Sequence, residues 1–425
     1  MRKVYQIFIH SPRLQSGLSI PPKPACRQGR EPRTLTRAGS IFVSFLIVFF
    51  LSNSISYAGQ GLKLGDLEVS PWGEIKVQYD DNVFWDSNES HDAKHDIILT
   101  LTPGIGLKLP FQDNVFKFDY HVDINRYNNY TSQNAANHFA SGKLELKWSE
   151  ITINLHDNFA RVFDRPSTED TTRVKRDDNT GGVFVKLQKE RLGIQIGYDN
   201  FTRTYKSDPI YKQFDRTDHR YSLILTHQTF PKTELLFEYD FNQIRYDEST
   251  HSDSDYHQFL IGATGDLTQK TTATIKTGYQ FSNYKDAGNP DFRSGVLYAD
   301  MTHKFSDKNS LKLAFLRTVY ESTYDANNYY GVNSVSGTFD HYFRPKVLGF
   351  ITGLYQLNAY PKEVTVDGET KKRKDNYYSL GTGLRYYLKN WLIFTLQAEH
   401  IVRDSNFPLF DVKENLVTFT TRAEF

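Results

Sequence analysis

The sequence has little cysteine and few long apolar runs, and both shortages narrow the class of protein. Its 425 residues include one cysteine, Cys26, in an N-terminal segment that we expect to be removed. A mature chain without cysteine would exclude disulfides, thiolate catalysis and cysteine-ligated metal. Apolar residues make up 39% of the chain, although 15% is aromatic. A soluble core would need continuous Leu, Ile and Val runs, so we expect the aromatic residues to face another apolar medium.

The one strongly apolar run covers residues 41–51 and has the features of a secretory signal. Arg33 and Arg37 precede it, and small residues ending at Ala58 follow it. Its eleven residues are fewer than the roughly twenty that a membrane-spanning helix needs. The order of basic, apolar and small residues therefore predicts cleavage after Ala58. The stretch before Arg33 is long for a signal, so a wrongly assigned start site is the alternative.

Removal of residues 1–58 would change the charge of the chain. That segment holds eight of the 51 basic residues and one of the 50 acidic residues, so the remainder has 43 basic and 49 acidic residues and a net charge of −6. This mildly acidic balance argues against nucleic acid or anionic lipid as a partner. We expect a leader at 1–58, a periplasmic segment at 59–72 and one large domain at 73–425.

Apolar and polar residues alternate through this large domain in segments of about ten residues or more. Phe116, Phe118 and Tyr120 alternate with Lys117 and Asp119, for example. Period two is typical of β-strands with one apolar and one polar face. The sequence therefore predicts an all-β protein.

The connections between these segments alternate in length and decide between a soluble sandwich and a membrane barrel. Tight links such as 149–150 and 231–232 take turns with long links such as 82–95, 163–175 and 360–376. Short periplasmic turns and long outer loops are typical of outer-membrane barrels. We expect a transmembrane antiparallel β-barrel of porin type with about 18 strands (16 being possible), in the outer membrane with both termini periplasmic. Whether 163–175 or 360–376 folds inward as a gate stays open.

A barrel of this size encloses a channel that its own side chains cannot fill. Channel formation is therefore the expected function, without a cofactor. The mixed charges of the polar face predict weak ion selectivity and hydrogen bonding to hydroxyl-rich solutes. The candidate pore-lining residues are Lys117, Asp119, Asp123, Lys143, Glu145, Lys147, Glu234, Glu238 and Asp240.

The last segment alternates up to the C-terminus and carries Phe419 and Phe425 on one face. A terminal strand ending in Phe resembles the signal that the barrel-assembly machinery binds. We expect this strand to pair with residues 73–81. Aromatic residues near segment ends predict two girdles at the membrane interfaces, in contact with outer-membrane lipid. Their members include Tyr79, Phe84, Trp85, Tyr127, Tyr130, Trp148, Tyr329, Tyr330, Tyr386, Tyr387 and Trp391.

A short motif near the mature N-terminus gives a more specific indication. It consists of Tyr79, Asp80, Asp81, Asn82, Val83 and Phe84, followed by Pro103 and Gly104. The motif resembles the opening of a family of outer-membrane β-barrel porins encoded with exopolysaccharide and capsule synthesis loci. This resemblance implies a conduit for a secreted glycan, with a periplasmic polysaccharide-export protein as partner. A general diffusion porin for small hydrophilic solutes is the alternative.

Other classes of site have weaker support. Ser222 with His219 and Asp218, or His227 with Asp240, would offer the groups of an outer-membrane hydrolase, but no spacing specifies that chemistry. A structural or adhesive barrel is the third class. The carboxylates of residues 80–82 could bind calcium, but a strand-to-loop transition that bonds its own backbone is the favoured interpretation. His91, Asp92, His95 and Asp96 have the chemistry of metal ligands, but a solvated surface loop is favoured there.

Overall fold

The computed structural model describes residues 61–88, 93–169, 172–206, 209–286, 290–324 and 327–425. The expected signal and its cleavage at Ala58 lie outside these residues. The strands are β1 (Leu62–Leu64), β2 (Leu67–Asp80), β3 (Asp96–Phe111), β4 (Asn114–Tyr127), β5 (Ala135–Trp148), β6 (Ile151–Asp164), β7 (Val174–Lys189), β8 (Leu192–Tyr205), β9 (Arg216–Phe230), β10 (Thr233–Tyr246), β11 (Ser254–Thr268), β12 (Thr271–Tyr284), β13 (Phe292–Lys304), β14 (Asn309–Glu321), β15 (Tyr329–Arg344), β16 (Val347–Val366), β17 (Glu369–Lys389), β18 (Leu392–Ser405) and β19 (Val412–Glu424).

Short 3-10 helices among the described residues include η2 (Thr131–Gln133), η3 (Pro209–Phe214) and η4 (Pro408–Phe410). Within the described ranges, no helix combines the length and the apolar character needed to cross a membrane.

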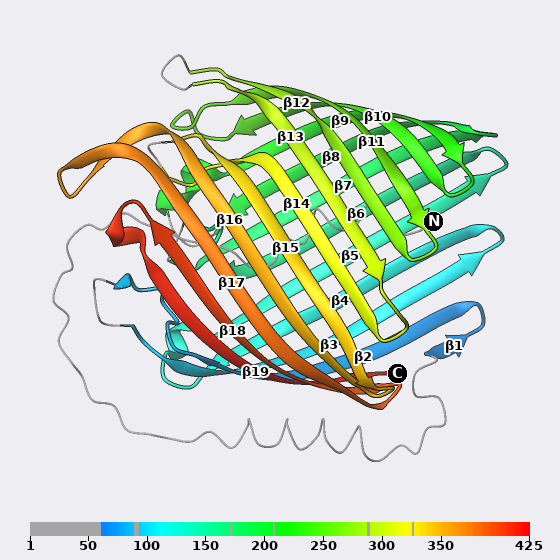
Figure 1. Ribbon diagram of the computed structural model, residues 1–425, viewed down its shortest axis with the longest axis horizontal. Helices are drawn as coiled ribbons and strands as arrows, with labels where there is room; N and C mark the ends of the chain where they lie inside the picture. The colour runs from blue at the N-terminus through cyan, green and yellow to red at the C-terminus, as the bar shows by residue number, and fades with distance from the viewer. Residues whose placement is uncertain (1–60, 89–92, 170–171, 207–208, 287–289, 325–326) are drawn as a thin grey trace.

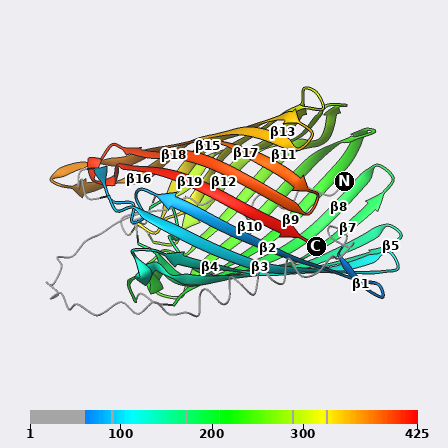
Figure 2. The same cartoon turned by 90° about the horizontal axis from the view of Figure 1, so that it is seen from below.

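The strands from β2 to β19 close into a barrel of 18 antiparallel strands, as the sequence predicts. Each strand pairs with the next, and β19 returns to pair with β2, where Ala423 lies opposite Gly73 and Leu416 opposite Asp80. The amide of Phe425 extends this seam by donating to the carbonyl of Pro71 (3.0 Å). Figure 2 shows β19 beside β2 at the seam. Strand β2 begins at Leu67, inside the segment expected to precede the barrel.

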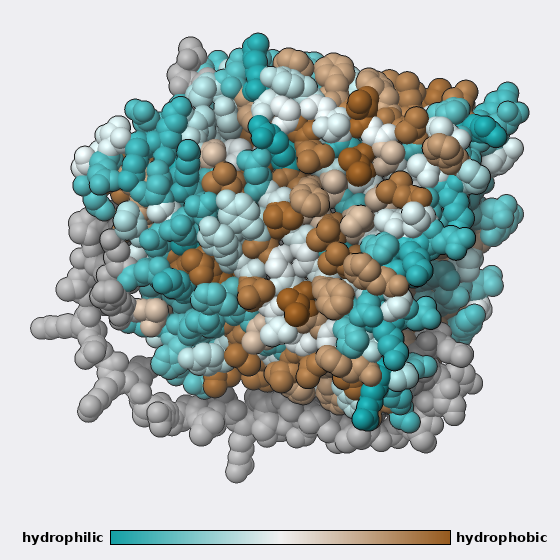
Figure 3. Space-filling model, viewed as in Figure 1, coloured by the Kyte–Doolittle hydropathy of each residue, from teal (hydrophilic) through white to brown (hydrophobic). Residues whose placement is uncertain are grey.

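The alternation of the sequence becomes an inward polar face and an outward apolar face. On β3, Thr100 and Thr102 are buried, whereas Ile97 is 52% exposed. Successive residues of a strand point to opposite faces, and the other strands repeat this division. In Figure 3 the apolar side chains form a band across the middle of the barrel, with hydrophilic side chains towards both ends. This band is the surface that suits membrane hydrocarbon.

The two ends of the barrel differ in the length of their connections. Tight turns such as Ser149-Glu150 lie at the end that also holds β1 and Phe425, which we call the short-turn end (Figure 1). The opposite end is the long-loop end. Which end faces the periplasm stays a prediction.

The expected loop at 360–376 is absent, and this prediction is wrong. Strands β16 and β17 continue as a paired hairpin to a two-residue turn at Asp367 and Gly368. Both turn residues have positive φ (51° and 83°), and Asp-Gly is a favoured sequence for such a turn. The hairpin projects beyond the neighbouring strands at the long-loop end (Figure 1).

The expected aromatic girdles are correct only in part. Trp148 and Tyr386 are exposed on the outward face, as an interfacial ring requires. Trp85, Tyr329 and Tyr330 are instead buried. These three residues belong to the packing at the long-loop end and not to a membrane girdle.

Candidate functional site

All nine predicted pore-lining residues lie on the inward face. Asp123 shows the basis of this placement, because its carboxylate accepts a hydrogen bond from the buried hydroxyl of Thr102 (2.7 Å). Residues directly opposite each other on antiparallel strands share a face. The register of β4, β5 and β10 therefore places all nine residues on the inward face. They are Lys117, Asp119, Asp123, Lys143, Glu145, Lys147, Glu234, Glu238 and Asp240. Their part in a conducting path stays a prediction.

Charges on the inward face occur in groups of opposite sign. Arg220 of β9 donates to Asp240 (2.9 Å) and lies 3.3 Å from Glu238 of the same neighbouring strand. The other carboxylate oxygen of Glu238 is 2.5 Å from the amine of Lys276 on β12. A second group surrounds Asp178. Pairing within the wall reduces the extended field of a single sign that strong ion selection requires.

Another part of the inward face carries amides and hydroxyls without charge. Gln258 of β11 donates to Gln280 of β12 (2.9 Å) and to the phenol oxygen of Tyr298 on β13 (3.2 Å). On β16, the amide of Gln356 donates to Asn358 (2.8 Å). These groups can both donate and accept hydrogen bonds, which is the chemistry needed beside a hydroxyl-rich solute.

One connection at the long-loop end passes over the lumen. Residues 165–169 follow β6, and we call them the crossing segment. They contact Ser322 and Thr323, which link β14 to β15, together with Asn358 of β16 and Arg403 of β18. Strands β6 and β16 are far apart around the closed ring. In one direction β7 to β15 lie between them, and in the other direction β17 to β19 and β2 to β5 do. The crossing segment therefore reaches the opposite wall.

Hydrogen bonds hold the end of the crossing segment in place. The buried carboxylate of Glu169 accepts from the hydroxyl of Ser322 (2.5 Å) and from the amide and hydroxyl of Thr323 (2.8 and 3.2 Å). The amide of Asn358 donates to the hydroxyl of Thr168 (3.0 Å). Burial raises the pKa of Glu169 above its usual range, although the three donors act in the opposite direction.

The start of the crossing segment is held by an aromatic contact. Arg165 donates to the carbonyl of Val83 (2.6 Å), and its guanidinium lies 5.0 Å from the ring centroid of Trp85. The guanidinium of Arg403 lies 5.7 Å from the same ring and donates to the carbonyl of Thr168 (3.1 Å). The indole thus contacts two cations, an arrangement that the electron-rich faces of the ring favour. The connection from β2 to β3 and the crossing segment therefore pack as one unit.

The residues of the N-terminal motif have structural roles near this unit and at the seam. Asp80 accepts from the backbone amide of Asn82 (2.9 Å), as expected for a strand-to-loop transition. The side chain of Asn82 donates to the carbonyls of Asp86 and Lys413 (both 3.0 Å). Val83 and Trp85, which follow it, are buried. The motif therefore fixes the connection on which Arg165 packs.

Gly104 has a separate role at the short-turn end. A Cβ atom at this position would lie 2.2 Å from the indole of Trp72, which points inward from β2. The indole also packs near His121 (centroids 5.4 Å apart) and under the guanidinium of Arg422 (4.2 Å). Because Gly104 has no side chain, the indole of Trp72 fits against β3 inside the lumen.

With a closed 18-strand barrel, an inward polar face and a crossing segment established, the comparison with protein families is decisive. Residues 55–425 match the family described as "Putative beta-barrel porin 2". The chain belongs to this porin family. The expected resemblance to a β-barrel porin family is thus confirmed, and the chain is an outer-membrane porin-type barrel. No curated protein matches the chain.

Solved structures similar to this porin include the following three. OpdK of Pseudomonas aeruginosa, in a crystal structure with vanillate, has 11% identity over 84% of this chain and 99% of that chain, with a TM-score of 0.48. OccK11 (OpdR) of the same organism has 12% identity over 87% and 100%, with a TM-score of 0.48. OccAB3 of Acinetobacter baumannii has 10% identity over 85% and 100%, with a TM-score of 0.47.

The hydrolase candidates of this porin are not assembled. Ser222 and Asp218 lie on the inward face of β9, whereas His219 lies on the outward face, where it bonds with Tyr198 (2.9 Å). His227 is outward, and its partner candidate Asp240 is inward. A base on the other side of a barrel wall cannot reach the nucleophile.

The loop at residues 91–96, where the metal interpretation is the disfavoured one, has a structural role where it is described. His91 and Asp92 lie outside the described residues. Asp96 accepts from the backbone amides of Asn129 and Tyr130 (both 3.0 Å). Among the described residues, no group of three potential His, Cys, Asp or Glu ligands is placed to hold a metal ion.

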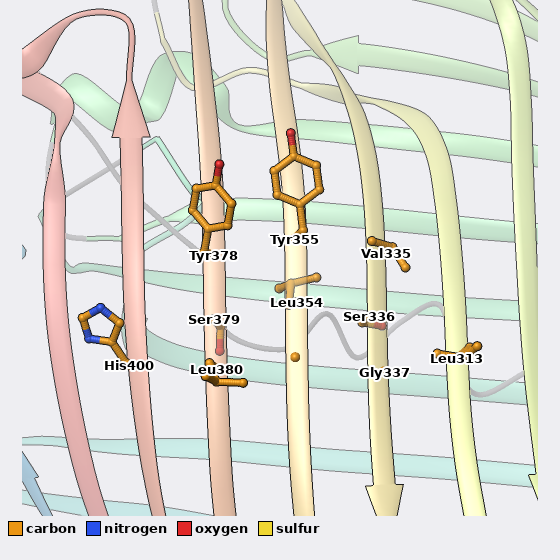
Figure 4. A pocket seen from close by; sticks show the side chains of 11 residues that line it. Leu313, Val335, Ser336, Gly337, Leu354, Tyr355, Tyr378, Ser379, Leu380 and His400 are labelled. Carbon is orange, nitrogen blue, oxygen red and sulfur yellow. The ribbon is translucent and has the colours of Figure 1, made fainter.

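A hollow of about 390 Å³ lies on the outward face of β14–β18 and not in the lumen. Figure 4 shows Tyr355 and Tyr378 side by side on β16 and β17, with Leu313 and Val335 on the adjoining strands. Outward side chains such as Leu380, which is 64% exposed, place this hollow against lipid. It therefore does not belong to a path through the barrel.

Proposed function

We propose that this chain is an outer-membrane pore for small hydrophilic solutes, with weak preference between anions and cations. The crossing segment carries the proposal, because residues 165–169 narrow the opening while the inward face stays polar along the barrel. The paired luminal charges support weak ion selection. The amide and hydroxyl groups supply hydrogen bonds that replace those of water around an uncharged solute.

The expected conduit for an exopolysaccharide has less support. An extended glycan would have to use the opening over which residues 165–169 are docked, so the crossing segment favours the small-solute alternative. The glycan, the periplasmic export protein and the barrel-assembly machinery stay predictions as partners. Deletion of the gene is expected to leave secreted polysaccharide unchanged, and a loss of that polysaccharide would restore the conduit.

Recordings from purified mature protein in planar bilayers test the proposed pore. We expect discrete conductance steps in potassium chloride and a reversal potential near zero in a salt gradient, because cations and carboxylates are interspersed in the lumen. A protein that is folded but silent at all voltages would contradict the pore. A strongly cation- or anion-selective current would contradict the interpretation of the luminal charges.

A further inference from the structure

The outward face of β6, β7 and β8 has an ordered change of chemistry from the middle of the barrel to the long-loop end. Nearest the short turns it carries exposed apolar side chains on all three strands. Leu155, Val185 and Ile196 belong to these rows, and the register places each beside an apolar neighbour. Such a surface suits hydrocarbon.

The next rows along the same face carry hydrogen-bonding groups. Asp157 lies opposite Gly181, which lies opposite Asn200 on β8. The amide of Asn179 donates to the exposed carboxylate of Asp157 (3.1 Å). A Cβ atom at Gly181 would be 2.9 Å from that carboxylate, so the glycine leaves it room against the sheet. These donors and acceptors face outward, where hydrocarbon alone offers them no partner.

Basic side chains complete the series at the long-loop end. Arg161 is 60% exposed and forms a two-pronged ion pair with Asp177 (2.8 and 2.9 Å). Lys206 is 48% exposed and lies 3.6 Å from the same carboxylate. Lys175 is exposed on the strand between them, and its carbonyl accepts from the amide of Lys206 (2.7 Å). Arg161 and Lys206 share the Asp177 carboxylate and Lys175 lies on the strand between them, so the described side chains of this cluster comprise three cations and one anion.

We propose that this face binds a phosphorylated glycolipid of the outer leaflet. The apolar rows would contact its acyl chains, the row of Asp157 and Asn200 its amide and sugar hydroxyls, and the cluster of Lys175, Lys206 and Arg161 its phosphate. The order of the three zones matches the order of groups along such a lipid. The net positive charge complements phosphate, and basic residues at a membrane surface attract anionic lipid. The proposal uses the outer-membrane location and the predicted orientation, with the long-loop end facing outward, and it does not depend on the proposed solute.

Lipid retention measured by native mass spectrometry tests the site. Full-length mature protein would be incubated in detergent with a bis-phosphorylated glycolipid, with the same glycolipid after dephosphorylation, or with inorganic phosphate as competitor. We expect the wild type to retain the phosphorylated lipid, and K175S/K206S to retain it at least about tenfold less, since two surface cations are lost. The matched control K285S/R293S removes two exposed cations, one directly after β12 and one on β13.

The outcomes separate the possible occupants. Unchanged retention in K175S/K206S, or equal retention of the dephosphorylated lipid by the wild type, would overturn the proposal. Competition by millimolar inorganic phosphate without lipid selectivity would also overturn it, as would a dimer of the wild type that K175S/K206S abolishes. A heat-dependent shift in gel mobility shows that each variant is folded. Equal losses in the control variant would point to general surface charge and against this site.

Discussion

Replacement of Glu169 by alanine should release the crossing segment. The carboxylate is buried and accepts three hydrogen bonds from Ser322 and Thr323. In Glu169→Ala, these donors lose their acceptor while the barrel wall keeps its sequence. We therefore expect the docked position of residues 165–169 to weaken without loss of the barrel.

The size of this effect follows from the contacts. A hydrogen bond to a charged group contributes about 1.5–3 kcal/mol, and burial of the carboxylate offsets part of the sum. We therefore expect Glu169→Ala to lose roughly 3 kcal/mol of docking free energy. This loss raises the ratio of released to docked segments roughly 100-fold. Ser167→Ala is a milder change, because it removes only a neutral hydroxyl, which contacts Thr323 (3.0 Å) and exchanges hydrogen bonds with the amide and carboxylate of Glu169 (3.1 and 3.4 Å). That change should cost about 1 kcal/mol.

Single-channel recordings in planar bilayers measure the released population. Glu169→Ala should show a larger conductance level far more often than the wild type, and Ser167→Ala should lie between the two. Folding of each variant is checked by heat-dependent gel mobility. If folded Glu169→Ala gives the same levels and frequencies as the wild type, the crossing segment does not limit the pore and the reasoning fails.

Three further predictions concern pH, packing and the seam. Burial raises the pKa of Glu169, so its protonated form stabilises docking of the crossing segment fully below the ordinary Glu pKa, and this stabilisation is lost as pH rises through the raised pKa. Large-conductance events should therefore become more frequent with rising pH in the wild type. In Glu169→Gln their frequency should not depend on pH. Gly104→Val should lower the Tm, since its Cβ would lie 2.2 Å from Trp72 and overpacking costs about 1–3 kcal/mol; Trp72→Ala in the same chain should restore it. Phe425→Ala removes a ring contact with Trp391 (centroids 5.7 Å apart) and should lower the free energy of unfolding by about 1 kcal/mol. We expect a smaller folded fraction after refolding. An unchanged fraction would show that the seam does not need this contact.

The barrel could be predicted from the sequence because its main signals are local. Alternation such as that of Phe116 and Lys117 assigns each residue to one of two faces, and a closed antiparallel barrel makes one of them the lumen. The alternating link lengths gave the strand number. Strand pairing at the seam, including Phe425, follows from closure and needs no long-range information.

The crossing segment could not be predicted because its partners are distant in the sequence. Residues 163–175 contain no pattern that indicates Ser322, Asn358 or Arg403, and only the closed ring places these residues opposite β6. The aromatic neighbours of Trp85 suggest a girdle, yet Arg165 of the crossing segment and Arg403 of β18 hold its ring inside. The hairpin at 360–376 is not evident from the sequence because charged residues make up much of it, and its buried residues Tyr360 and Val364 pack on β15 and η4 and not on lipid.

Liposome swelling with sugars of increasing size tests the central claim most directly. Vesicles containing the wild-type protein should admit monosaccharides quickly and larger oligosaccharides progressively more slowly, and Glu169→Ala should admit sugars that the wild type excludes. Uptake of long oligosaccharides by the wild type, at rates like those of monosaccharides, would contradict a small-solute pore narrowed by residues 165–169. Absence of any swelling with folded protein would contradict the pore itself.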